Sequence, residues 1–472
     1  MIMPDKLHRH FQWIGVAIYL AALLIVSVCF QAYRLQPLWM AWGIATVLFF
    51  FGLTYVCHRR WQHNDARLFL RKVFWWALGI RVVYVVGIIF YYYWQTGVSF
   101  EYQAADSWMY HNTATYLSRL VREGHVGEAY RLLNGNTMGF SDQGYLIYLT
   151  TLYTCFDNNI LGPRLLKALM SAYTCVVVYK LASRNLGEKT GRLAAVMAVF
   201  LPQFIHYTGT YMKETELVFL ATLALERMDY LIRSHRYTFW NLLFPILLTA
   251  LTFGFRTIVG MALLASFLIY IAFGPKELLS KKSRGVILGV TAAVGLVFLF
   301  TPIGREMLIV FKVNVLTSDV LVEKYQNMGL QYAEYAHYKY MAPGAFTLPL
   351  TNLVEIANPN QKMMTGTYFV KNYLAFFAIW CFVAAIRQRR CRDFSLIGTF
   401  TLLYVLIIAF SFAFNSERYH QPALPGMLIM AAFTMTRFKR KDFAFYYSYD
   451  ILLLAAIIAW NYVKLAARGL IF

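Results

Sequence analysis

Asp106 is the residue in this sequence best suited to act as a base, because it is a lone carboxylate just beyond the end of a long apolar segment. Lys213, Arg256 and Arg418 are cations that border apolar stretches elsewhere in the chain. A positioned carboxylate can accept the proton of a hydroxyl or amine. Arginine and lysine can hold a phosphate by charge-assisted hydrogen bonds and stabilise its charge as it leaves. These residue types suit chemistry with a phosphate leaving group.

The composition predicts an integral membrane protein. Of the 472 residues, 59% are hydrophobic and 14% are charged, and the mean hydropathy is +0.50, whereas a soluble domain averages about 25% charged residues. Apolar stretches with the length that crosses a bilayer as a helix recur along the whole chain. Because lipid leaves bare backbone groups without partners, we expect an all-α polytopic protein with about 13 transmembrane helices.

The predicted spans alternate with basic segments. The spans are residues 13–30, 38–57, 73–94, 160–179, 193–208, 215–232, 240–255, 259–273, 286–301, 368–386, 394–414, 424–436 and 446–463. Every second span is followed by a short segment rich in arginine and lysine. Such segments stay in the cytoplasm, so the pattern predicts a cytoplasmic N-terminus. It also places Asp106, Lys213, Arg256 and Arg418 together on the extracytoplasmic face.

Two long polar segments, residues 95–159 and 302–367, are predicted to be large extracytoplasmic loops of a single membrane-embedded domain, residues 1–472. Residues 105–123 have apolar side chains at helical spacing, which predicts an interfacial helix. The second loop has a tyrosine-rich run at 331–340, whose aromatic residues suit membrane anchoring or stacking on sugar rings. We interpret the first loop as the rim of an active site.

Each charged residue also has a purely structural interpretation. Lys213 could form a local ion pair with Glu214, and Arg418 could do so with Glu417. Arg256 could extend its charged end to the membrane surface. The predicted location of these residues on one face favours a functional site, because ionisable groups near hydrocarbon are costly.

Other features narrow the class of protein. The net charge of +21 is explained by basic loops beside an anionic leaflet, and no basic soluble module for nucleic acid is present. The six cysteines form no CxxC motif or Cys/His cluster, which argues against a zinc site or a disulfide framework. Arg81 lies inside a predicted span, and we expect it to pair within the helix bundle.

Four stretches resemble the GT-C superfamily of polyprenyl-phosphate-sugar-dependent glycosyltransferases, such as the protein O-mannosyltransferases and the aminoarabinose transferases. They are residues 106–114 (DSWMYHNTA), 162–187, 201–214 (LPQFIHYTGTYMKE) and 417–425 (ERYHQPALP). The resemblance implies a GT-C-like fold with an extracytoplasmic active site. It also implies an undecaprenyl- or dolichyl-phosphate-linked sugar as donor substrate, and inversion at the anomeric carbon.

The resemblance assigns roles to individual residues. Asp106 matches the loop aspartate that acts as base or orients the acceptor, although Ser107 follows it where many members have a second acid. Lys213 and Arg418 lie in matching motifs and are expected to bind the lipid phosphate, with Arg256 added from the predicted topology. Further candidate substrate contacts are Tyr110, His111, Glu214, Tyr419 and His420. Asp106 and His111 lack a third ligand, so no required metal or other cofactor is expected.

Two other functions remain open at this stage. An O-antigen-type polymerase or ligase would use a glycan-lipid donor, and a transporter or flippase would need ionisable residues at the middle of the bilayer. For the leading hypothesis, the acceptor is a lipid, a glycan or a protein. The expected partners are the donor, the acceptor and membrane lipids, with no nucleic acid. The expected location is a bacterial inner or plasma membrane.

Overall fold

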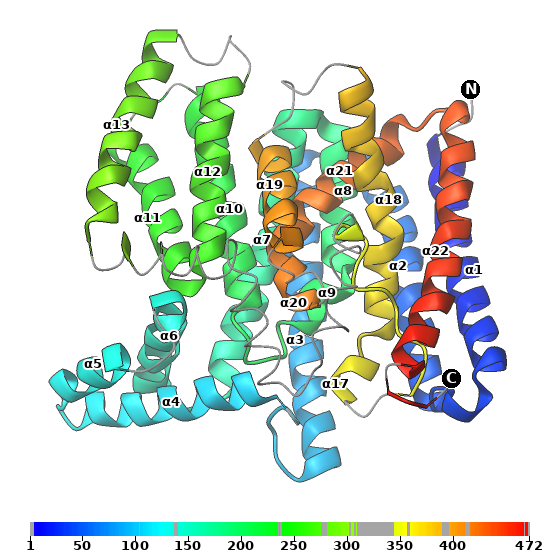
Figure 1. Cartoon of the computed structure of the whole chain (residues 1–472), viewed down its shortest axis with the longest axis horizontal. Coiled ribbons are helices and arrows are strands. Elements are labelled where there is room, and N and C mark those ends of the chain that lie inside the picture. The colour runs from blue at the N-terminus through cyan, green and yellow to red at the C-terminus, as the bar shows by residue number, and fades with distance from the viewer. Residues whose placement is uncertain are drawn as a thin grey trace.

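The computed structural model is a bundle of helices with a layer of further helices across one end (Figure 1). The residues that it describes are 4–102, 104–135, 140–234, 236, 238–274, 281–301, 304–305, 308, 344–355, 359–388, 396–410, 416–466 and 468–470. Within these ranges the regular elements are helices. One isolated β-bridge pairs Arg34 with Val354. The predicted all-α class is confirmed for this part of the chain.

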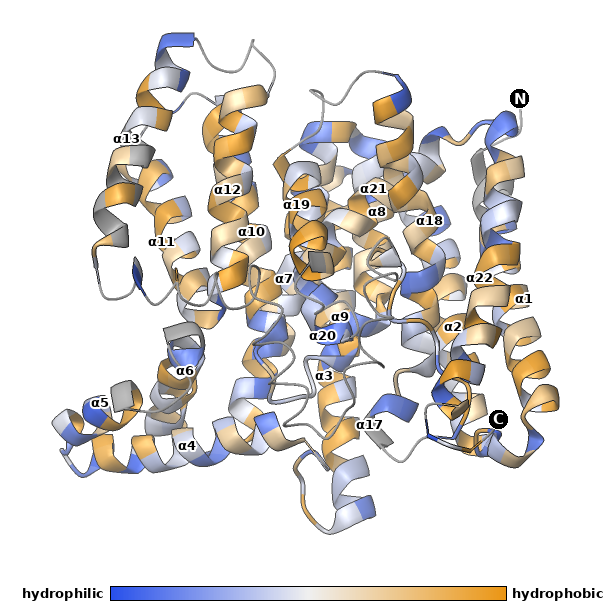
Figure 2. Cartoon of the chain, in the orientation of Figure 1, coloured by the Kyte–Doolittle hydropathy of each residue, from blue (hydrophilic) through white to orange (hydrophobic). Residues whose placement is uncertain are grey.

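Among the described residues, six helices are long and apolar enough to cross a membrane. They are α1 (Pro4–Cys29), α2 (Pro37–Trp61), α3 (Ala66–Thr96), α7 (Leu161–Leu186), α18 (Thr365–Arg387) and α22 (Phe443–Ala466). Three shorter helices, α11 (Phe239–Phe255), α12 (Thr257–Phe273) and α19 (Leu396–Phe410), are also apolar. Figure 2 shows hydrophobic residues along the bundle and hydrophilic residues gathered near its two ends. The protein is an integral membrane protein, and the number of spans beyond these six stays a prediction.

The remaining predicted spans also coincide with helices. They overlap α8 (Glu188–Phe200), α9 (Pro202–His206), α10 (Glu214–Ser234), α13 (Lys281–Leu299) and α21 (Leu424–Arg437). The predicted continuous span at 193–208 is wrong, because the helix breaks at Leu201, which is extended. Pro202 follows and cannot donate the backbone hydrogen bond that would continue α8. With 13 residues, α8 is about 20 Å long, too short to cross about 30 Å of hydrocarbon.

Arg81 of α3 satisfies the polar end that this break creates inside the bundle. Its guanidinium donates hydrogen bonds to the carbonyl oxygens of Ala198 and Val199, each at 3.1 Å, and to Ser171 Oγ at 2.7 Å. The last carbonyls of a helix have no partner within the helix and carry partial negative charge, so a buried cation suits them. The expectation that Arg81 pairs within the bundle is confirmed.

The first long loop folds as α4 (Ala105–Arg122), α5 (Val126–Gly135) and α6 (Phe140–Phe156). In Figure 1, α4 runs across the end of the bundle that is opposite the N-terminus. Leu117 and Leu120 are buried, as the helical spacing predicts. Trp108 and Tyr116 lie on the other side of α4, where they are 36% and 50% exposed. Exposed aromatic side chains on a helix of this kind suit a membrane interface.

Most of the second long loop lies outside the described residues, including the tyrosine-rich run at 331–340. Its described parts include residues 344–355 and the short helix α17 (Pro359–Lys362). Asn372 of α18 accepts from the Thr351 hydroxyl at 2.8 Å and donates to the Pro349 carbonyl at 2.9 Å. These buried hydrogen bonds attach residues 347–351 to the bundle.

Candidate active site

Asp106 lies in the first turn of α4, where the partial positive charge of the helix terminus favours a carboxylate. Its side chain is 43% exposed and forms an ion pair with the guanidinium of Arg418. Arg418 belongs to the short helix α20 (Glu417–His420), 312 positions further along the chain. The fold therefore joins the candidate base directly to one of the candidate phosphate ligands.

Arg256 and Arg418 both lie against the ring of Tyr419. Arg256 stands between α11 and α12 in an extended conformation, and its guanidinium forms an ion pair with Glu214 at 3.2 Å. The Arg256 guanidinium carbon is 4.8 Å from the centre of the Tyr419 ring, and that of Arg418 is 5.0 Å from the same ring. Because an aromatic ring attracts cations, Tyr419 helps to keep two like charges close together.

Lys213 precedes α10 and forms an ion pair with Asp142 of α6. The Lys213 side chain is buried, and this burial lowers the pKa of its amine well below the usual value. Arg256 and Arg418 lower the pKa further, whereas Glu214 and Asp106 oppose the shift. The Lys213 amine is therefore close enough to Arg256, Glu214, Arg418 and Asp106 for their charges to influence its pKa.

We call Asp106, Asp142, Lys213, Glu214, Arg256 and Arg418 the Asp106 cluster. Its cations and carboxylates form three matched ion pairs. The pairs differ in exposure: Glu214 is 2% exposed, whereas the Asp106 side chain is 43% exposed. An anion that enters from the exposed side would meet the pair of Asp106 and Arg418 first.

Buried polar contacts hold the backbone that leads to Lys213. The Lys167 amine donates to the carbonyl oxygens of Thr210, at 2.7 Å, and Met212, and lies 3.4 Å from the Glu216 carboxylate. The Tyr211 amide, between those two carbonyls, donates to the Glu101 carboxylate. Since a buried polar group without a partner is costly, these contacts define the path of the chain just before Lys213.

Arg164 of α7 supports the same segment from a second direction. Its guanidinium lies 3.6 Å from the Glu101 carboxylate and 4.9 Å from the centre of the Tyr211 ring. Its side chain is fully buried, as is that of Glu101. A buried charge needs such partners, so Arg164 and Glu101 form a structural pair beneath the Asp106 cluster.

The other candidate substrate contacts have different surroundings. His111 Nδ1 is 2.6 Å from the Tyr153 hydroxyl, and burial followed by the charge of Arg164 lowers the pKa of His111. Tyr110 packs edge-on against Tyr145, with ring centres 4.9 Å apart, and its hydroxyl is near enough for all of Glu214, Arg256, Asp106 and Arg418 to influence its pKa. His420 is fully buried.

Both local ion pairs considered from the sequence are wrong. Lys213 pairs with Asp142 instead of Glu214, and Glu417 pairs with Lys371 of α18 at 2.9 Å instead of with Arg418. A side chain at the end of a helix can reach a neighbouring element more easily than the adjacent residue of its own chain, because consecutive side chains point in different directions. The site is therefore assembled by contacts between elements.

Four charged residues near the site were not predicted from the sequence: Asp142, Lys167, Arg164 and Lys371. The last three lie inside predicted apolar spans, so the signal that drew attention to Arg81 was also present for them. Among the described residues, no group of three histidine, cysteine, aspartate or glutamate side chains could hold a metal ion. The expectation that no metal is required stays a prediction.

Comparison with known proteins bears on this cluster. Residues 144–303 match the family model described as dolichyl-phosphate-mannose-protein mannosyltransferase. The predicted resemblance to the GT-C glycosyltransferases is confirmed. The matched residues include Lys213, Glu214 and Arg256, and also Arg164 and Lys167 beneath them, whereas Asp106 and Arg418 lie outside the match.

The chain also shows similarity to a solved structure. That structure is the archaeal oligosaccharyltransferase AglB from Archaeoglobus fulgidus, in complex with an inhibitory peptide and a dolichol-phosphate. The similarity has a TM-score of 0.42 at 13% sequence identity and covers 84% of this chain and 55% of that one, so the present chain spans about half the length of AglB. No curated protein matches the chain in sequence.

Proposed function

We propose that this protein transfers a sugar from a polyprenyl-phosphate-linked donor to an acceptor at the extracytoplasmic face of the membrane. The family match supports the reaction class and the donor class, since the matched family is named for dolichyl-phosphate-mannose. The observation that carries the assignment to a site is the partly exposed ion pair between Asp106 and Arg418, beside Arg256 and Lys213.

In this proposal the donor phosphate replaces Asp106 as the partner of Arg418. Arginine binds phosphate in a bidentate manner, and Arg256 and Lys213 add positive charge on the same side. The Asp106 carboxylate is then released to accept a proton. One binding event would thus fix the donor and prepare the base, which is why a pair exposed on one side is more useful here than a buried pair.

The reaction follows from these positions. The acceptor hydroxyl or amine gives its proton to the Asp106 carboxylate as its oxygen or nitrogen forms a bond with the anomeric carbon. The bond between that carbon and the phosphate oxygen breaks, and the electron pair leaves with the lipid phosphate. Arg418, Arg256 and Lys213 stabilise the charge that grows on the phosphate. Attack from the face opposite the leaving group inverts the anomeric carbon.

The surrounding elements have proposed roles as well. We propose that α4, α5 and α6 form the rim at which the acceptor enters. Tyr110 and Tyr419 are proposed substrate contacts, because both adjoin the charges of the cluster. Glu214, His111 and His420 are further proposed substrate contacts.

The test is transfer of a radiolabelled sugar from a polyprenyl-phosphate sugar to acceptors present in native membranes, catalysed by the purified protein in liposomes. Wild-type protein should release polyprenyl phosphate in step with labelled product, and Asp106→Asn should release little of either. Full transfer by Asp106→Asn would reject the role of Asp106. Lipid analysis of a deletion strain separates the alternative, since uncapped short glycan chains would indicate a polymerase or ligase.

A further inference from the structure

A cavity lies at the end of the bundle that is opposite the Asp106 cluster. It has a volume of about 690 Å³ and is formed around the last turns of α7, α18 and α21. These helices end in Figure 1 at the side of the molecule that carries the N-terminus. The cavity contains no residue of the proposed active site.

In the described part of its lining, this cavity has four cations: Arg387, Arg437, Lys439 and Lys441. Within the described part of the chain, none of the four side chains lies within ion-pair distance of a carboxylate. The one acidic residue in the described lining, Asp442, accepts a hydrogen bond from the Lys439 backbone amide at 3.0 Å. The cavity therefore has a clear excess of positive charge.

Cations at helix carboxyl ends have a simpler explanation, because they offset the partial negative charge of the helix. That explanation accounts for Arg387 at the end of α18 and for Arg437 at the end of α21. It does not account for Lys439 and Lys441, which lie beyond α21 and line the same cavity. It also does not account for the cavity, since exposed cations can offset a helix end without one.

Apolar side chains line the cavity beside its four cations. Trp380, Val383, Met430 and Phe433 line the interior beside the cations. On α18, the side chains of Val383 and Ile386 are 40% and 64% exposed. Apolar side chains therefore lie next to the opening of the cavity. The cavity thus joins an anion-binding rim to a surface that suits an alkyl chain.

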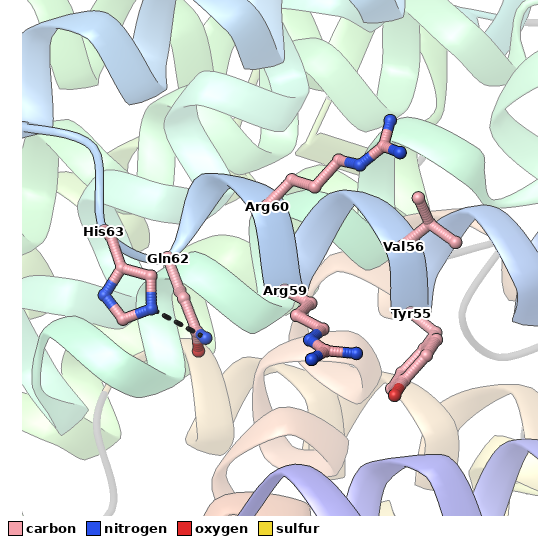
Figure 3. Close-up of a pocket in the computed structure, with 6 residues that line it drawn as sticks. All are labelled: Tyr55, Val56, Arg59, Arg60, Gln62 and His63. Atoms are coloured by element: carbon pink, nitrogen blue, oxygen red, sulfur yellow. Dashed lines mark hydrogen bonds between the residues drawn. The ribbon is translucent and has the colours of Figure 1, made fainter.

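A smaller basic cavity at the end of α2 lacks such a wall (Figure 3). Its volume is about 520 Å³, and its lining residues are Tyr55, Val56, Arg59, Arg60, Gln62 and His63. Arg192 of α8 donates to the Trp61 and Gln62 carbonyls, so this end of α2 adjoins the start of α8. The comparison shows that basic residues alone do not create the mixed lining of the larger cavity.

We infer that the larger cavity binds the phosphate headgroup of an anionic phospholipid, with the first part of one acyl chain along Trp380 and Val383. Phosphate offers the charge that the rim attracts, and the apolar wall recognises the chain that a soluble anion lacks. Such a lipid would fasten α18 to α21 at the end of the bundle remote from the chemistry.

The experiment uses the full-length protein in nanodiscs of phosphatidylcholine with a minor fraction of phosphatidylglycerol. Native mass spectrometry of the released protein measures how much phosphatidylglycerol stays bound relative to phosphatidylcholine. The Arg387→Gln/Arg437→Gln variant should reduce this preference by roughly 25-fold, since each basic residue near an anionic lipid contributes about fivefold. The matched control is Lys281→Gln/Lys282→Gln, which removes two exposed cations at the start of α13 that do not line the cavity.

Unchanged preference in the Arg387→Gln/Arg437→Gln variant, or an equal loss in the control, would overturn the inference. A second measurement needs no variant: inorganic phosphate is added to the wild-type protein in detergent with phosphatidylglycerol present. Retention of the lipid is expected, because phosphate lacks the acyl chain. Displacement at low phosphate concentration would reassign the cavity to a soluble anion.

Discussion

Helix α10 carries a charged cluster at each end, and the two clusters are built differently. At its start, Glu214 belongs to the Asp106 cluster. Toward its end, Glu226 and Asp229 pair with Arg184 of α7 at 2.5 and 3.0 Å, and Asp229 also pairs with Arg233 at 3.0 Å. We call these four residues the Arg184 cluster.

The Arg184 cluster is closed. Asn185 donates to Asp229 at 3.1 Å and accepts from Arg233 at 2.5 Å, and both acids are buried. All of its residues come from α7 and α10, and Asp229 and Arg233 are one helical turn apart. The Asp106 cluster draws on α4, α6, α20 and the starts of α10 and α12, and its outer pair is exposed. The two acids of the Arg184 cluster are at most 4% exposed, whereas the Asp106 side chain is 43% exposed. The buried acids join two helices, whereas an exposed acid leaves its arginine able to exchange partners with a ligand.

Asp106→Asn is expected to have the largest effect among the variants that test the difference between the two clusters. The variant should lose transfer activity by roughly 10²–10⁴-fold, the usual contribution of a general base, with the thermal unfolding midpoint unchanged because the side chain is partly exposed. Activity and unfolding are measured on the same purified sample. A large drop in the unfolding midpoint would mean that the exposed pair is structural, like the Arg184 cluster.

The matched change in the closed cluster is Asp229→Asn. It removes the shared partner of Arg184 and Arg233, while Arg184 keeps its ion pair with Glu226. The free energy of unfolding should therefore fall by about 1.5–3 kcal/mol, the contribution of hydrogen bonds to charged groups. The measurement is thermal or denaturant unfolding in detergent. Protein that remains folded should keep its activity per molecule. A loss of activity without a loss of stability would contradict the structural role.

Arg418→Lys should have a smaller effect than Asp106→Asn. Lysine keeps the charge near Asp106 and loses the paired hydrogen bonds that a planar guanidinium makes with phosphate. We expect the KM for the lipid-linked donor to rise by roughly tenfold, the effect of losing about 1.4 kcal/mol of binding free energy. The control is Arg122→Lys in α4, whose partner is the exposed Asp157. Equal effects in the two variants would remove the special role of Arg418.

The smallest expected effect is on the pH dependence of stability, through His111, a residue type that the Arg184 cluster lacks. Burial lowers the pKa of His111 in the folded protein below 6.5. Below that pH the unfolded state binds a proton that the folded state does not, so stability should fall as the pH falls. His111→Asn should flatten this dependence between pH 7.5 and 5.5, measured by thermal unfolding. An unchanged slope would show that another group is responsible.

Individual residues show how far the sequence could be interpreted. The pattern around Asp106 predicted a helix, and α4 confirms it, but the pairing of Asp106 with Arg418 joins residues 312 positions apart. Asp142 has no charged neighbour in sequence to mark it, and it meets Lys213 only because α6 packs near the start of α10. Lys371 could have been noticed as a charge within an apolar span, yet nothing near it in the sequence indicates Glu417 as its partner.

Hydropathy, the length of apolar stretches and the alternation of basic segments can be read along the chain. The membrane class, most of the helices and the resemblance to a glycosyltransferase family therefore follow from the order of residues alone. The break at Leu201, the partners of the buried charges and the contrast between the Asp106 and Arg184 clusters depend on how the helices pack. Ion pairing depends on distances of a few ångströms and on exclusion of water. Both arise only when helices distant in sequence pack together.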